Sequence, residues 1–121
     1  MPTILPFMID KEREEIDQLF RKVQVKVFRQ FQKNPDVAAV LFLIGVRELG
    51  QLKSKFTKQE KNDLLHVAVC TLLSAEGYYE KTGTSEDGWP IWIATKKLPE
   101  MTGNEQEYLL KKHIIRYFDT L

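Results

Sequence analysis

Apolar residues recur every three or four positions in four stretches of the chain, which is the spacing of one face of an α-helix. The first stretch shows it most regularly, at Ile16, Phe20, Val23, Val27 and Phe31. The spacing predicts four helices, at residues 10–33, 35–49, 57–75 and 104–119. Residues 1–9 hold two prolines, which restrict the backbone, so we expect an extended arm there that lies against the domain.

Cap and turn residues mark the ends of these helices. Asn34 and Pro35 indicate a stop followed by a restart, with Asn34 as the cap and Pro35 in the first helical position. Thr57 and Glu60 have the spacing of a capping box, in which each side chain accepts a hydrogen bond from the other residue's backbone amide. Gly50 can end the second helix in the left-handed conformation.

Between the third and fourth helices the apolar period shortens to two, which is typical of strands. Residues 78–95 therefore predict a β-hairpin, with a strand at residues 78–80, a polar turn at residues 81–88 and a returning strand at residues 89–95. On the returning strand, one face carries Trp89, Ile91 and Ile93, and the other carries Trp92 and Ala94. Pro90 has no backbone N–H, which excludes it from a central ladder position.

This order of elements predicts the fold class. It is α+β and mainly α, with four helices and one β-hairpin between the third and the fourth, loosely the order of a winged helix. The chain has 121 residues, of which 43% are hydrophobic and 29% charged, so it fits a single globular domain over residues 1–121.

The charge balance and the apolar runs argue against two classes of partner. The formal net charge is +1, whereas proteins that bind nucleic acid usually carry a clear basic excess. No apolar run approaches the roughly 20 residues that span a bilayer, so we expect no membrane partner. The N-terminus lacks the basic segment of a signal peptide and the single cysteine forms no internal disulfide, so we expect a cytoplasmic protein.

His66 and Cys70 stand four positions apart and share a face of the third predicted helix. Such a pair could hold zinc together with His113, or could act as a nucleophile with its base. However, the chain offers no second cysteine, and apolar neighbours such as Val67 and Leu72 favour a thiol buried as a small hydrophobic group. We therefore expect no catalytic residue, no metal and no cofactor, and we keep the His66–Cys70 pair as the reactive or metal-binding alternative.

The hairpin gathers side chains that suit a binding surface, because aromatic residues with a polar group are enriched in protein interfaces. The candidate binding residues are Tyr78, Tyr79, Asp87, Trp89 and Trp92. The same residues could instead serve as core packing, although a small hairpin does not easily bury both of its faces. We expect a non-enzymatic interaction module that binds a protein partner or a second copy of itself, as a homodimer.

A cluster of lysines keeps a nucleic-acid-binding alternative open. Its members are Lys53, Lys55, Lys58, Lys61 and Lys81. In a winged-helix protein the third helix would enter the major groove and the hairpin would touch the phosphate backbone. Against this interpretation, Glu86 and Asp87 would face the phosphates from the hairpin tip, and two more carboxylates would lie on the reading helix. We therefore expect no nucleic-acid partner.

Several short runs together resemble a known group of proteins. They are LFLIGVRELG at residues 41–50, FTKQEK at residues 56–61, HVAVC at residues 66–70 and DGWP at residues 87–90. In these runs the chain resembles small conserved hypothetical proteins of Bacteroidetes, over nearly its whole length. The resemblance implies a bacterial cytosolic protein. It implies no activity, cofactor or catalytic residue.

Overall fold

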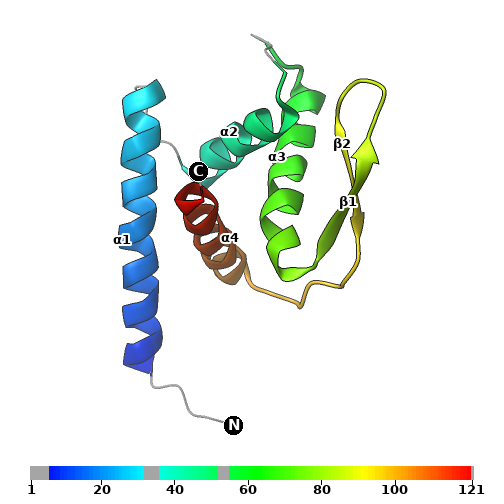
Figure 1. The fold of residues 1–121 in the computed structure, drawn as a ribbon. Coiled ribbons are helices and arrows are strands. Elements are labelled where there is room, and N and C mark those ends of the chain that lie inside the picture. Colours follow the sequence, from blue (N-terminus) through cyan, green and yellow to red (C-terminus); the bar gives the residue numbers. More distant parts are fainter. Residues whose placement is uncertain (1–5, 32–35, 52–54, 121) are drawn as a thin grey trace. The chain divides into compact units, whose positions relative to one another are not determined.

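The computed structural model describes residues 6–31, 36–51 and 55–120 (Figure 1). The fold is α+β and mainly α, with four helices and a two-stranded antiparallel hairpin between the third and the fourth, which confirms the predicted class. The chain forms two compact units, one of residues 1–35 and 101–121 and the other of residues 36–100. The second unit is thus inserted in the sequence between the two helices of the first. The single domain expected over the whole chain stays a prediction.

The first unit contains α1 (Pro6–Phe31) and α4 (Gly103–Asp119), which run in the same direction (Figure 1). Two contacts agree with this direction: Tyr108 meets Glu12, and further along both helices Lys111 meets Asp17. The side chains buried in this unit include those of Phe20, Val23, His113 and Ile114. Phe20 and Val23, two members of the apolar stripe predicted from the sequence, therefore lie on the face of α1 that packs.

The start of α1 differs from the prediction. The helix begins at Pro6, so the extended arm expected over residues 1–9 is wrong from residue 6 onward, and residues 1–5 lie outside the described residues. Proline is well tolerated in the first turn of a helix, where its missing N–H would have had no partner. The predicted end at residue 33 also lies outside the described residues, which follow α1 as far as Phe31.

The second unit is built on two helices, α2 (Val37–Leu49) and α3 (Lys58–Leu73). Their close crossing centres on Gly45, where an added Cβ would lie against the carbonyl oxygen of Leu64 and 2.8 Å from its carbonyl carbon. Ile44 and Leu64 are almost fully buried at this crossing, with 1% and 0% of their surface exposed. The absence of a side chain at Gly45 lets the two main chains touch.

Cap residues fix the ends of these helices. Asp36 caps α2, with its Oδ1 accepting a hydrogen bond from the Ala39 amide at 2.8 Å. The predicted start at residue 35 is wrong, because the carboxylate of Asp36 both caps the helix and suits the positive end of its dipole. The capping box of Thr57 and Glu60 is confirmed, with hydrogen bonds of 3.1 and 2.9 Å. Gly50 is left-handed as predicted, with φ of 71°.

The third helix ends two residues earlier than predicted. The α-helix stops at Leu73, and the chain tightens into a 3₁₀ turn, η1 (Ser74–Glu76), before Gly77 adopts a φ of 80°. The Ser74 hydroxyl donates to the carbonyl of Thr71 at 2.6 Å, which holds this last turn. The tight turn brings the chain directly into the hairpin.

The hairpin consists of β1 (Tyr79–Thr84) and β2 (Pro90–Ala94). The turn predicted over residues 81–88 is wrong over its first half, because β1 continues to Thr84 and carries a bulge between Lys81 and Gly83. Pro90 takes the first position of β2, where a residue without an N–H is tolerated.

Candidate functional site

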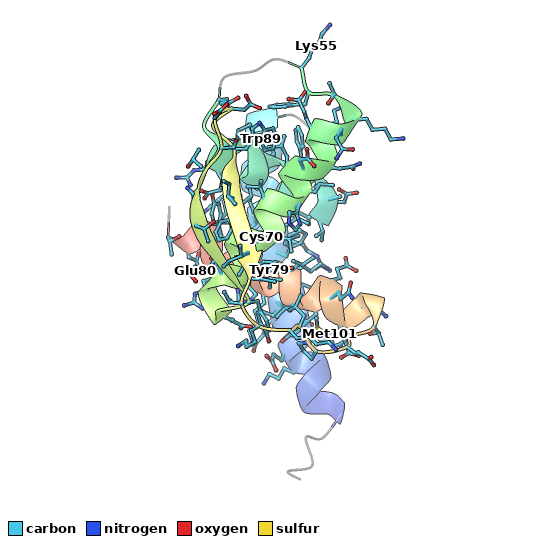
Figure 2. The ribbon with its side chains drawn as sticks, turned by 90° about the vertical axis from the view of Figure 1, so that its right-hand side faces the viewer. Lys55, Cys70, Tyr79, Glu80, Trp89 and Met101 are labelled. Atoms are coloured by element: carbon cyan, nitrogen blue, oxygen red, sulfur yellow. The ribbon has the colours of Figure 1, made fainter. Side chains whose placement is uncertain are left out.

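The hairpin packs against α3 with one of its two faces (Figure 2). On this inner face, the ring of Tyr79 meets that of His66 edge to face, with 6.3 Å between ring centres. Trp92 lies on the same face, since it pairs with Lys81, two residues after Tyr79, and its indole nitrogen is buried. Aromatic side chains thus join the hairpin to the helix.

The outer face of the hairpin is exposed to solvent, yet β2 places large apolar side chains on it. Ile91 and Ile93 alternate with Trp92 and therefore point away from α3. Their exposed fractions are 44% and 46%, which places them among the few large apolar side chains exposed in the described part of the chain. The outer face is therefore apolar on β2 and in contact with solvent, while on β1 it carries the exposed Glu80, which pairs with Ile93.

The predicted binding residues divide between packing and the hairpin tip. Tyr78 is half-buried with its ring 4.3 Å from the Lys96 ammonium group. At the tip, the Asp87 carbonyl accepts a 2.6 Å hydrogen bond from Gln51. Tyr79 lies near the base of the hairpin and Trp89 near its tip (Figure 2), so these aromatic residues do not form one patch.

Ile91 and Ile93 were missing from the predicted binding residues, although the alternation of the sequence already separates them from Trp92. The signal that could have identified them is that the predicted sheet has only two strands. A hairpin of two strands that is covered by a helix on one face leaves its other face uncovered, and on β2 that face is apolar.

The His66–Cys70 pair does form, but in an environment that opposes reactivity. The Cys70 sulfur lies 3.5 Å from Nε2 of His66. Cys70 has 0% of its surface exposed, and burial raises the pKa of its thiol to about 11. The thiol is therefore protonated near neutral pH, whereas the nucleophile and the metal ligand are both the thiolate. The burial expected for the thiol is confirmed, whereas His66 itself is exposed.

A metal site would need further ligands. Within the described ranges, no three His, Cys, Asp or Glu side chains come close enough together to hold a metal ion. His113, the third predicted member of the group, is buried in the first unit, whereas His66 and Cys70 belong to the second.

The lysines that suggest nucleic-acid binding are mixed with acidic side chains. Lys55, Lys58, Lys61 and Lys81 are exposed, while Lys53 lies outside the described residues. Lys55 points outward from the loop before α3 (Figure 2). Asp63 on α3 and the carboxylates at the hairpin tip are exposed as well. This arrangement is a surface of both signs rather than a basic stripe.

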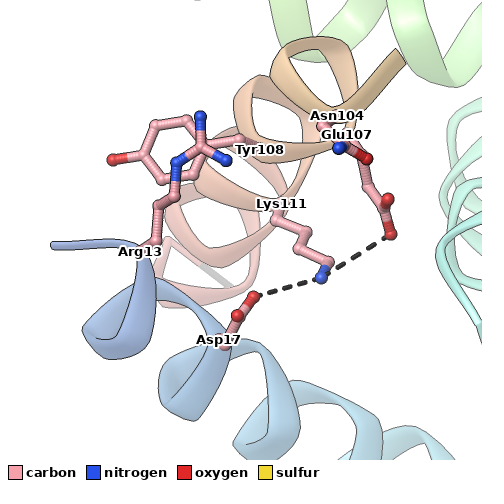
Figure 3. A pocket seen from close by; sticks show the side chains of 6 residues that line it. All are labelled: Arg13, Asp17, Asn104, Glu107, Tyr108 and Lys111. Carbon is pink, nitrogen blue, oxygen red and sulfur yellow. Dashed lines mark hydrogen bonds and ion pairs between the residues drawn. The ribbon is translucent and has the colours of Figure 1, made fainter. Parts of the chain in front are cut away.

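The first unit holds a shallow cavity of about 120 Å³ between α1 and α4 (Figure 3). Its lining residues are Arg13, Asp17, Asn104, Glu107, Tyr108 and Lys111. The Lys111 ammonium group pairs with Asp17 at 3.1 Å and with Glu107 at 3.6 Å. Three of the four charged side chains that line this cavity are thus paired with one another.

Tyr108 completes the link between the two helices beside this cavity. Its ring lies 5.5 Å from the Arg13 guanidinium carbon, and its hydroxyl donates to Glu12 at 2.6 Å. Burial raises the pKa of Tyr108 to about 12, and the hydrogen bond and negative charge of Glu12 add to the rise, while Arg13 opposes it. The polar cluster therefore joins α1 to α4.

In the part of the chain that the structure describes, no helix is both long and apolar enough to cross a membrane. Comparisons with models of protein families, with curated proteins and with solved structures gave no match. The resemblance to small Bacteroidetes proteins stays a prediction.

Proposed function

We propose that this chain is a non-enzymatic interaction module of a bacterial cytoplasm, and that it binds a partner protein through the outer face of its hairpin. The observation that carries the proposal is the exposure of Ile91 and Ile93, at 44% and 46%, on the face of β2 that points away from α3. Exposed apolar surface on a rigid element is a usual feature of protein interfaces.

The rest of the hairpin supports this role by holding the surface rigid. The inner face is fixed to α3 through Tyr79 and His66, and the tip is tied to the loop after α2 by the hydrogen bond from Gln51. A partner therefore meets a preformed surface, and little conformational entropy is lost on binding. The single free cysteine, buried as Cys70, agrees with a reducing compartment.

An enzymatic role at His66 and Cys70 has less support. The thiol has no exposed surface and a raised pKa, so it can neither meet a substrate nor act as a thiolate near neutral pH. Nucleic-acid binding also has less support, because Glu86 and Asp87 are exposed at the tip where phosphates would lie.

Site-specific photo-crosslinking tests the proposal. A photoreactive phenylalanine derivative replaces Ile91 or Ile93 in the full chain, in the cells that make the protein. Leu19 is the matched control, since it is also a large apolar side chain and is 40% exposed on α1. We expect discrete adducts with a protein other than this chain from the two hairpin positions, and no such adduct from the control. Illumination that yields no adduct at either hairpin position would overturn the proposal.

A further inference from the structure

On the outward face of α1, acidic and basic residues stand at equal distances on either side of one residue. The pattern is centred on Gln18, with Glu14 and Glu15 before it and Arg21 and Lys22 after it. At 3.6 residues per turn, all four charged residues lie within about 60° of Gln18 around the helix. This direction is opposite to the buried stripe, and all five side chains are exposed.

We infer that a second copy of the chain docks on this face, with the two α1 helices antiparallel and crossing at Gln18. In that register Glu14 faces Arg21 of the second copy and Glu15 faces Lys22 of the second copy. The two-fold symmetry repeats both pairs, so four ion pairs form and no like charges oppose each other. A parallel arrangement would set Glu14 against Glu14 and Lys22 against Lys22, which is repulsive.

Residues at the two ends of the same face would also meet favourably in this dimer. Val25 is 49% exposed, one heptad after Gln18, and Lys11 stands one heptad before it. In the antiparallel register the aliphatic part of each Lys11 side chain would cover Val25 of the other copy. The helix dipole acts within the first and last turns, whereas Glu14 and Lys22 lie more than two turns from Pro6 and Phe31. The dipole does not explain why the charges gather on the side opposite the core, symmetrically about one residue.

The expected dimer is weak and sensitive to salt. Ion pairs between exposed side chains contribute little each and are screened by dissolved ions. With Val25 as the main apolar contribution, we expect a dissociation constant on the order of 0.1–1 mM at low ionic strength. The dimer would present two hairpin faces at once, which raises the apparent affinity for a partner with two binding sites. The docking on α1 itself does not depend on the proposed hairpin function.

Two charge-reversal variants test the inference. Glu14→Lys/Glu15→Lys makes the four charged residues around Gln18 basic, and Arg21→Glu/Lys22→Glu makes the same four acidic. Sedimentation velocity of the full chain measures the association of the wild type, of each variant and of their equimolar mixture. We expect the wild type to associate, each variant alone to be monomeric, and the mixture to regain an affinity within about threefold of the wild type. Raising the salt from about 20 to 500 mM should weaken the wild-type dimer at least tenfold.

Each contrary result is decisive. A wild type that stays monomeric up to about 1 mM overturns the inference, and so does a variant that dimerises alone. A mixture that fails to associate while both variants keep the circular dichroism of the wild type also overturns it. If one variant fails to fold, the other variant and the salt dependence of the wild type decide. Crosslinks from Ile91 or Ile93 to another protein would leave the proposed function standing in all these cases.

Discussion

Replacing Gly45 by alanine should force α2 away from α3. The new Cβ would lie against the carbonyl oxygen of Leu64 and 2.8 Å from its carbonyl carbon, closer than Cβ atoms come in real proteins. Both of these Leu64 atoms belong to the main chain, so no side-chain rotation can make room. Relief requires the two helices to separate.

Two opposing effects set the size of this change. Alanine is about 1 kcal/mol more favourable than glycine inside a helix. Overpacking a core position costs about 1–3 kcal/mol, and a contact with main-chain atoms belongs at the upper end of that range. Separation of the helices also weakens packing around Ile44 and Leu64, which are 1% and 0% exposed. We therefore expect the Gly45→Ala variant to lose about 2 kcal/mol of its free energy of unfolding.

Urea denaturation followed by far-UV circular dichroism and tryptophan fluorescence measures this loss. Both tryptophans lie in the second unit, so the fluorescence reports on the packing of α2 and α3. Gly103→Ala is the matched control, because a Cβ there meets open space, and it should change stability by no more than about 1 kcal/mol. A Gly45→Ala variant that unfolds at the same urea concentration as the wild type, or at a higher one, would refute the close crossing.

Three further predictions concern single side chains. Cys70 should resist iodoacetamide in the native protein and react only as urea unfolds it, because it is fully buried with a pKa of about 11; rapid labelling of native protein would contradict its burial. Tyr108 has a folded pKa of about 12, above its ordinary value of 10.0, so its contribution to stability is complete below pH 10 and is lost as the pH rises to 12. Urea titrations should show this loss in the wild type and a smaller loss in Tyr108→Phe, whereas equal losses in both proteins would contradict the assignment. Thr57→Ala removes the acceptor for the Glu60 amide and should cost about 1 kcal/mol in the same titration, while Thr57→Ser should cost much less; equal stability of the two would refute the cap.

The helices were predictable because their signals are local. The apolar stripe of α1 and the capping box of Thr57 and Glu60 depend on residues within one or two turns of each other. Both features can therefore be predicted from the local sequence alone. The errors arose where two local signals competed. Pro35 favoured an early start of α2, but Asp36 has the side chain that reaches the Ala39 amide.

The extent of the hairpin strands and the face that packs depend on residues that are distant in the sequence. The existence of the hairpin followed from the change of period, but β1 extends to Thr84 because cross-strand pairing with Pro90 and Ile91 outweighs the polar character of residues 81–84. The packed face was also not predictable, since it depends on α3, which precedes the hairpin in sequence and meets it only in the folded unit.

The candidate site was predicted only in part for the same reason. Residue type favoured Trp92 and Tyr79 as the binding surface, because aromatics are common in interfaces. The fold uses them to attach the hairpin to α3 and leaves Ile91 and Ile93 outward. The pairing of His66 with Cys70 was predictable from their spacing, but the exposure of one and the burial of the other depend on the packing of the whole unit.

Oxidative footprinting inside the cells that make the protein tests the proposed contact most directly. Hydroxyl radicals modify aliphatic side chains at rates that follow their exposure, and mass spectrometry reads each position. We expect Ile91 and Ile93 to be modified several times more slowly in cells than in dilute purified protein, while Leu19, 40% exposed, changes little. Equal rates in cells and in dilute solution at both isoleucines would mean that nothing covers the hairpin, and would contradict the account.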